Sequence, residues 1–163
     1  MIPRANDRSI MLNDTNDPNQ NHQMAPLQAD YQAVLQAPVP TVFNAVANHD
    51  QYCQLMPNLK HVHFSEPDAI RSCDFGNDMI LQEKIILWKP PSTYAYTALT
   101  PNPFGIWEHY AEVRCEPHQD GTYLRWQHYF KHDDLAAMLI LLNQMFDEIF
   151  GRLFKQFDGR RLA

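Results

Sequence analysis

Cysteine, strongly basic segments and long apolar runs are all scarce in this sequence, and each scarcity excludes a class of protein. The three cysteines, Cys53, Cys73 and Cys115, have no short spacing between any two, which fits free thiols in a reducing compartment. The 13 basic residues, against 19 acidic ones, form no run that nucleic-acid binding would need. No apolar stretch reaches the roughly 20 residues of a membrane-spanning helix. We therefore expect a soluble cytoplasmic protein with no nucleic-acid partner and no integral membrane association.

The common catalytic motifs are also missing. The sequence contains no Gly-x-Ser-x-Gly elbow, no Gly-rich phosphate loop, no His-Glu-x-x-His and no paired-cysteine metal motif. His61 and His63 stand two apart on a predicted strand and so share a face, but no Cys, Asp or Glu nearby completes a ligand set. The sequence therefore predicts no metal site and no cofactor, and the two histidines are expected on a solvated strand face.

The chain of 163 residues has the length of one domain preceded by a tail. Residues 1–24 are rich in Asn, Asp and Gln and show no sustained hydrophobic period, which is typical of a flexible polar tail. Residues 25–163 form the predicted domain. Its first element is a strand that begins at Leu27, because Ala29, Tyr31, Ala33 and Leu35 alternate with polar residues.

The remaining pattern predicts an α+β domain. A short helix starts at Pro40 or Thr41, and a second one is stopped by Pro57. A helix of some 24 residues starts at an N-cap of Asp133 or Asp134 and ends at Gly159. Five further strands, making six with the first, are predicted at residues 60–67, 78–88, 93–99, 106–116 and 122–131.

The last two of these strands form a predicted hairpin with one apolar face. If Pro117 lies opposite Thr122, one face of the hairpin is apolar and aromatic and the other is charged. An antiparallel sheet with one solvated face needs a cover on the other face, and the apolar stripe of the long C-terminal helix supplies it. The residues on the inward face are Trp107, His109, Ala111, Val113, Leu124, Trp126, His128 and Phe130.

This order of elements resembles the START-like (SRPBCC) superfamily, and more narrowly the polyketide cyclase/dehydrase and lipid-transport family. The resemblance covers residues 27–157 and lies in the proline-led first helix, in Met56-Pro57, in Pro90-Pro91 and in Gly121-Thr122-x-Leu124-x-Trp126. It implies a helix-grip fold, in which a curved antiparallel sheet of about six or seven strands wraps around a long C-terminal helix, with two short helices after the first strand. It also implies a cavity for hydrophobic small molecules or lipids.

The walls of such a cavity would be the inward face of the hairpin and the stripe of the helix. Rings and thioethers suit flat or flexible apolar ligands. The orientation of Tyr94 and Tyr96 on their strand is left open by the pattern. The candidate ligand-binding residues are Tyr96, Trp107, His109, Trp126, His128, Phe130, Met138, Leu142 and Met145.

Three functions remain open at this stage. The first is binding of a hydrophobic small molecule or lipid, such as a polyketide-like or fatty compound. The second is a cyclase or dehydratase in which Glu83, His109 and His128 transfer protons, since Glu83 lies in the inward phase of its strand and imidazoles act near neutral pH. An acid among apolar neighbours needs a partner or a raised pKa, so Glu83 could equally form a salt bridge to a basic residue or bond to the sheet edge. The third is an interaction protein, for example a homodimer, whose cavity is filled by its own side chains and whose wide helix stripe or N-terminal tail binds another chain.

Overall fold

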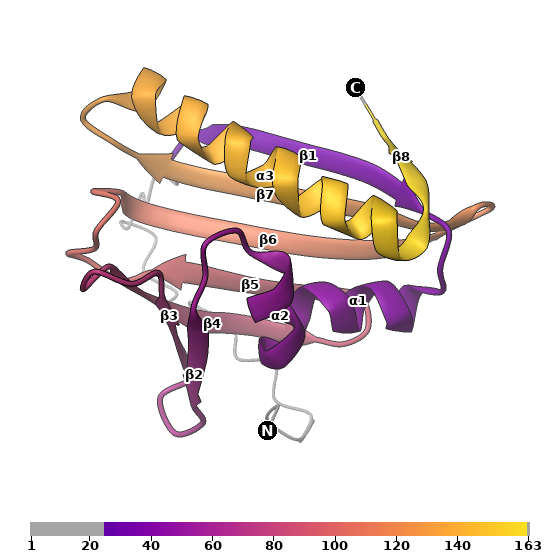
Figure 1. The fold of residues 1–163 in the computed structure, drawn as a ribbon, viewed down its shortest axis with the longest axis horizontal. Coiled ribbons are helices and arrows are strands. Elements are labelled where there is room, and N and C mark those ends of the chain that lie inside the picture. The colour runs from indigo at the N-terminus through magenta and orange to yellow at the C-terminus, as the bar shows by residue number, and fades with distance from the viewer. Residues whose placement is uncertain (1–24, 163) are drawn as a thin grey trace, which may run out of the picture.

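The computed structural model describes residues 25–162 as an eight-stranded sheet with three helices (Figure 1). The long helix runs across one face of the sheet, and the two short helices pack beside it. In chain order the elements are β1 (Leu27–Leu35), α1 (Val39–Ala47), α2 (His49–Leu55), β2 (His61–Ser65), β3 (Ile70–Asp74), β4 (Ile80–Lys89), β5 (Thr93–Ala98), β6 (Trp107–His118), β7 (Gly121–Lys131), α3 (Leu135–Phe157) and β8 (Gly159–Arg161).

All neighbouring strands are antiparallel, in the order β2-β3-β4-β5-β6-β7-β1-β8. Strands β2 to β7 follow the chain as a meander, and β1 then pairs with β7. The hairpin has the expected register, with Pro117 opposite Thr122 and Val113 opposite Trp126. The alternating side chains of β7 are therefore buried on one face and half-exposed on the other.

Two of the helices, α2 and α3, begin at residues whose side chains cap the helix N-terminus. Asn48 caps α2 by accepting hydrogen bonds from the backbone N–H groups of Asp50 and Gln51. The Asp134 side chain caps α3 by accepting from the N–H of Ala137 at 3.1 Å. The inward stripe of α3 contains Met138, Leu142, Phe146, Ile149, Phe150 and Leu153.

The core lies between the helices and the inner face of the sheet. The Tyr31 ring of β1 stacks on Phe146 of α3 with ring centres 4.1 Å apart, and Trp126 of β7 meets the same Phe146 edge to face at 4.9 Å. On the α1 side the hydroxyl of Tyr94 donates to the carbonyl of Val46 at 2.7 Å. These contacts attach α1 and α3 to the same face of the sheet.

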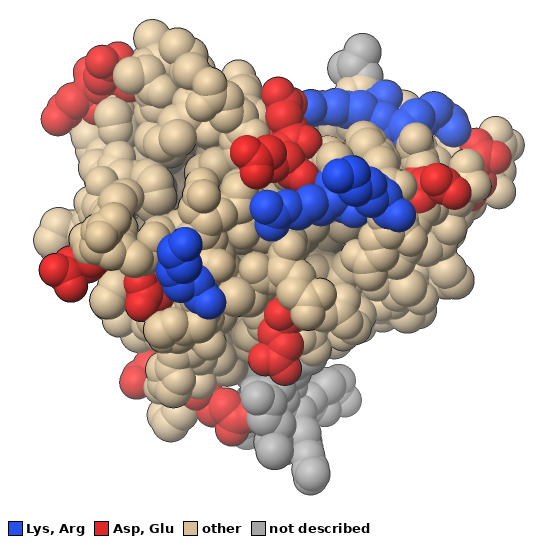
Figure 2. Space-filling view, in the orientation of Figure 1, with Lys and Arg blue, Asp and Glu red and all other residues tan. Residues whose placement is uncertain are grey.

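The fold class and the helix-grip architecture predicted from the sequence are confirmed, with two strands more than the six assigned. Strand β3 escaped the sequence analysis because Arg71 and Ser72 interrupt any apolar alternation, and β8 because it has only three residues, all exposed. The predicted tail, residues 1–24, lies outside the described residues. Within residues 25–162 no helix has the length and apolar character to cross a membrane. On the face shown in Figure 2, acidic and basic side chains are interspersed.

Candidate functional site

A cavity lies between α3, α2 and the inner face of strands β3 to β7. Its volume is about 60 Å³, measured as the space open to the centre of a water molecule, and its lining is almost entirely apolar. At about 10–15 Å³ per water on this measure, it has room for roughly four to six waters, or for one small ring. The lining residues are Tyr52, Met56, Cys73, Phe75, Leu81, Glu83, Tyr96, Ala98, Phe104, Ile106, His109, His128, Phe130, Met138, Leu142, Met145 and Phe146.

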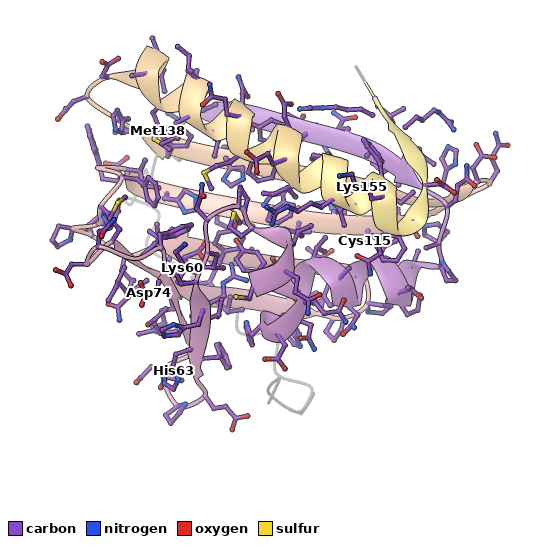
Figure 3. All side chains as sticks on the ribbon, in the orientation of Figure 1. Lys60, His63, Asp74, Cys115, Met138 and Lys155 are labelled. Atoms are coloured by element: carbon purple, nitrogen blue, oxygen red, sulfur yellow. The ribbon has the colours of Figure 1, made fainter. Side chains whose placement is uncertain are left out.

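Seven of the nine ligand-binding candidates predicted from the sequence line this cavity. Four come from the sheet, at Tyr96, His109, His128 and Phe130. The other three are residues of α3 at helical spacing, Met138, Leu142 and Met145, and Figure 3 shows Met138 near the N-terminal end of that helix. The sheet residues and the helix residues face each other, because alternation along the strands and the periodicity of the helix both direct these side chains into the space between sheet and helix.

The remaining two candidates, Trp107 and Trp126, are not part of the lining. The inward position expected for Trp107 is wrong, because a register shift between Trp107 and Tyr110 sets Trp107 opposite the exposed Lys131. Glu108 takes up the irregularity with a φ of 48°. Trp126 is fully buried behind the wall, where its indole N–H donates to the Tyr96 hydroxyl at 3.0 Å and so orients a lining residue.

Glu83 is buried in the cavity wall beside a cation that the sequence analysis missed. The Arg71 guanidinium lies 3.3 Å from the Glu83 carboxylate, and the two side chains are 0% and 4% exposed. The guanidinium also lies over the rings of Tyr52 and Tyr96, at 3.8 and 4.9 Å from their centres. The Glu83 carboxylate thus has the basic partner that its inward phase demanded.

The arrangement leaves donors of Arg71 without acceptors. The ion pair is close but not aligned as a hydrogen bond, and in the described part of the chain Nε, Nη1 and Nη2 of Arg71 have no hydrogen-bond partner. The Cys73 thiol donates to the same carboxylate at 3.2 Å. Burial raises the pKa of that thiol, so Cys73 stays protonated at neutral pH. Burial, the largest single influence, lowers the pKa of Arg71, but Glu83 together with the neighbouring Tyr52, Tyr94 and Cys73 outweighs it, and the pKa is raised.

His109 and His128 lie next to each other on the cavity wall. Nε2 of His109 is 3.4 Å from Nδ1 of His128, and the backbone N–H of Ala98 donates to Nδ1 of His109 at 2.9 Å. Burial lowers the pKa of His109 to about 4. Burial and the neighbouring His109 lower the pKa of His128 as well. Both rings are therefore neutral at pH 7.

Several other lining residues that the sequence analysis missed come from elements with weak patterns. Tyr52 and Met56 lie on and after the short helix α2, and Phe104 and Ile106 lie in the connection before β6. Phe75 and Phe104 meet edge to face at 5.6 Å. A connection between strands carries no periodicity, so no signal in the sequence could have placed its residues in the wall. Arg71 was missed together with its strand.

The histidines considered as metal ligands lie elsewhere. His61 and His63 are exposed on β2, and Figure 3 shows His63 far from Met138. Within residues 25–162, no three His, Cys, Asp or Glu residues are grouped so that they could hold a metal ion.

The fold and the cavity together define a helix-grip protein with an internal apolar site. Residues 26–157 match the family described as polyketide cyclase / dehydrase and lipid transport. The chain belongs to this family, within the START-like superfamily that its sequence resembles. No curated protein matches the sequence.

Solved structures similar to this chain share its fold at low sequence identity. The protein XoxI from Bacillus cereus is 10% identical with a TM-score of 0.67, over 79% of this chain and 92% of that one. A protein from Thermobifida fusca is 20% identical with a TM-score of 0.62, over 77% and 93%. The two-domain ARO/CYC protein StfQ of the steffimycin biosynthetic pathway is 12% identical with a TM-score of 0.66, over 80% of this chain and 49% of that one.

Proposed function

We propose that this protein binds a small hydrophobic molecule in the cavity between the sheet and α3. The observation that carries the proposal is the apolar cavity itself, bounded by α3, α2 and five strands. A well-packed core leaves few voids larger than a water molecule, so a space of about 60 Å³ is more than a packing defect. Family membership supports the same reading. The volume favours a ligand of one ring or a short chain over a long lipid.

Binding can be followed through the methionines. Met56, Met138 and Met145 line the cavity, whereas Met79 is 38% exposed and does not. In protein with ¹³C-labelled methionine methyl groups, α-methylstyrene, an apolar probe of one ring, should shift the three cavity signals and leave that of Met79 in place. Cavity signals that stay fixed with this probe and with its ketone analogue acetophenone would refute the proposal.

A pair of variants tests the location. Ala98 lines the cavity and is 5% exposed, so Ala98→Leu adds three carbons to the space that a ligand would fill. Ala137 is exposed on α3, outside the lining, and Ala137→Leu is the matched control. We expect the first variant to lose binding of the probe and the second to keep it. Extraction of the mildly purified protein, with native and denatured masses compared, would identify any natural ligand.

A cyclase or dehydratase activity is the second candidate, and the buried Glu83 carboxylate in the cavity wall favours it. In such a reaction Glu83 removes a proton from the carbon beside a ligand carbonyl. The C–H electron pair becomes the C=C bond of an enolate, the carbonyl π pair moves onto the oxygen, and the proton stays on Glu83. His128 donates a hydrogen bond to the enolate oxygen. The lowered pKa values of His109 and His128 make both rings weak bases at pH 7, so Glu83 is the base of this scheme.

The enzyme candidate has its own measurement. Enolisation of acetophenone in D₂O replaces its methyl protons by deuterium, which proton NMR records directly. The wild type should accelerate this exchange, and Glu83→Asp, which withdraws the carboxylate by one carbon, should slow it. If acetophenone binds but its exchange is not accelerated, the enzyme candidate is refuted and binding is the only function that stays. The cytoplasmic location, the homodimer and the single domain over residues 25–163 stay predictions from the sequence.

A further inference from the structure

The hydrogen bonds around the two cavity histidines have only one possible direction. A backbone N–H can only donate, so Nδ1 of His109 must accept from Ala98. A neutral imidazole carries one proton, which in His109 is then on Nε2. This N–H points to Nδ1 of His128 at 3.4 Å, so that nitrogen accepts in turn. The proton of neutral His128 is therefore on Nε2.

The local backbone explains why a side chain accepts from Ala98. The β5–β6 ladder ends at the pair Tyr96 and Ala111, just before the irregular part of β6. Beyond this point the imidazole of His109 takes the place of a backbone carbonyl and satisfies the Ala98 N–H. The chain of hydrogen bonds is thereby fixed to the sheet and does not depend on a mobile surface group.

The last donor of the chain has no acceptor. His128 is 5% exposed, lines the cavity, and its Nε2 has no hydrogen-bond partner among the described residues. The His128 ring borders the cavity and meets Phe146 of α3 edge to face, with ring centres 5.0 Å apart. Within residues 25–162, Arg71 also has buried nitrogens near the cavity wall without a hydrogen-bond partner. These nitrogens lie against the rings of Tyr52 and Tyr96, and they too are donors. A buried donor without an acceptor is costly, so a ligand that supplies one gains affinity.

We propose that the cavity selects hydrophobic molecules that carry a hydrogen-bond acceptor, such as a ketone or aldehyde carbonyl, because the chain from Ala98 through His109 to His128 presents one N–H to the ligand. This inference rests on the proposed binding function and adds a chemical class to it. An aliphatic or aromatic hydrocarbon of the same shape fills the cavity but leaves the His128 donor unpartnered.

Acetophenone and α-methylstyrene are a matched pair for this test, since they differ only by C=O in place of C=CH₂. Their affinities are measured by titration of the labelled methionine signals. Because water hydrates the ketone better than the alkene, the two affinities cannot be compared directly. We therefore take the ratio of the ketone affinity to the alkene affinity in the wild type and divide it by the same ratio in His128→Phe, which cancels the difference in hydration. We expect this quotient to be about fivefold to tenfold, the range of one hydrogen bond. His63→Phe, an exposed histidine outside the cavity, is the matched control and should leave the ratio unchanged.

The outcomes separate the two proposals. Failure of both probes to bind refutes the binding function. Binding of both with a quotient near one refutes only the selection by His128. A measurement on the wild type needs no variant: ¹⁵N NMR of the imidazoles should find both rings protonated at Nε2 at neutral pH, with the His128 Nε2 proton shifted by acetophenone and not by α-methylstyrene. A His128 ring protonated at Nδ1 would overturn the inference.

Discussion

The buried ion pair of Arg71 and Glu83 allows a quantitative prediction about stability. The Glu83→Gln substitution keeps the shape of the side chain but removes the only negative charge within residues 25–162 that pairs with the buried guanidinium, 3.3 Å away. Both side chains are almost completely shielded from water, so solvent cannot replace the lost charge. Removing one partner of such a pair costs about 3–5 kcal/mol, because the other charge stays buried without compensation.

Two features of the site modify this magnitude. The rings of Tyr52 and Tyr96 contact the guanidinium and retain part of its stabilisation after the substitution. Within residues 25–162 the nitrogens of Arg71 already lack hydrogen-bond acceptors, so Glu83→Gln removes charge compensation but no aligned hydrogen bond of the guanidinium. The Gln oxygen can still accept from the Cys73 thiol. We therefore expect a loss near the lower limit, about 3 kcal/mol.

Urea unfolding followed by tryptophan fluorescence measures the effect. With a slope of about 2 kcal/mol per molar urea, the midpoint should fall by about 1.5 M. The double variant Arg71→Met with Glu83→Leu removes both charges, and it should be more stable than Glu83→Gln alone. Glu108→Gln is the surface control, since its pair with Lys131 is half-exposed and should change the free energy of unfolding by less than about 1 kcal/mol.

The reasoning is refuted by either of two results. If Glu83→Gln costs less than about 1 kcal/mol, the guanidinium is compensated by water or by the tyrosines and the carboxylate is not needed. If the double variant is as unstable as the single one, the loss comes from packing and not from an uncompensated charge.

Three further predictions concern single residues. Burial lowers the pKa of His109 from 6.5 to about 4, so the unfolded chain binds a proton in this interval that the folded protein does not. The free energy of unfolding should fall by about 1.4 kcal/mol per unit on acidification from pH 6.5 to 4, and urea midpoints of His109→Phe should lack this part of the slope. In native protein, iodoacetamide should modify the half-buried Cys53 only, as judged by mass, because Cys73 and Cys115 are buried and burial raises their pKa values. Gly151→Ala should raise the stability by about 0.5–1 kcal/mol in thermal unfolding, since an added Cβ meets no atom within 4 Å in a helix interior.

The parts of the fold that the sequence predicted are those in which many residues repeat one period. The long helix was placed to within a residue or two by the stripe from Met138 to Leu153 and the cap at Asp134. The hairpin register followed from the turn at Gly121 and two alternating strands. Such patterns report burial directly, because each residue of the face must be apolar for the layer to pack.

The parts that escaped prediction depend on single residues. One irregular position near Glu108 reversed the face of Trp107, and nothing in the local sequence distinguishes it from regular strand. Arg71 is a charged residue on the inner face of β3, where a pattern analysis expects an apolar one. Its partner Glu83 could be recognised from the sequence as a carboxylate in the inward, apolar phase of its strand. Predicting that the two side chains pair, however, requires the register of β3 with β4, which sets Arg71 directly opposite Glu83.

The attachment of α3 is uneven along its length. In the C-terminal half, Arg152 donates to the carbonyls of Gln54 and Leu55 at 3.0 and 3.3 Å, and Asp147 pairs with Arg161 of β8. The N-terminal half stands over the cavity, where Asn143 accepts a hydrogen bond from the Tyr31 hydroxyl at 2.7 Å, and Ile140 on its outer side is 62% exposed. Local opening therefore costs least at that end, so amide hydrogen exchange should become slower from Met138 toward Leu153. If the proposed ligand leaves through partial opening of this half of the helix, its residence time will report the stability of one helical segment and not that of the whole domain.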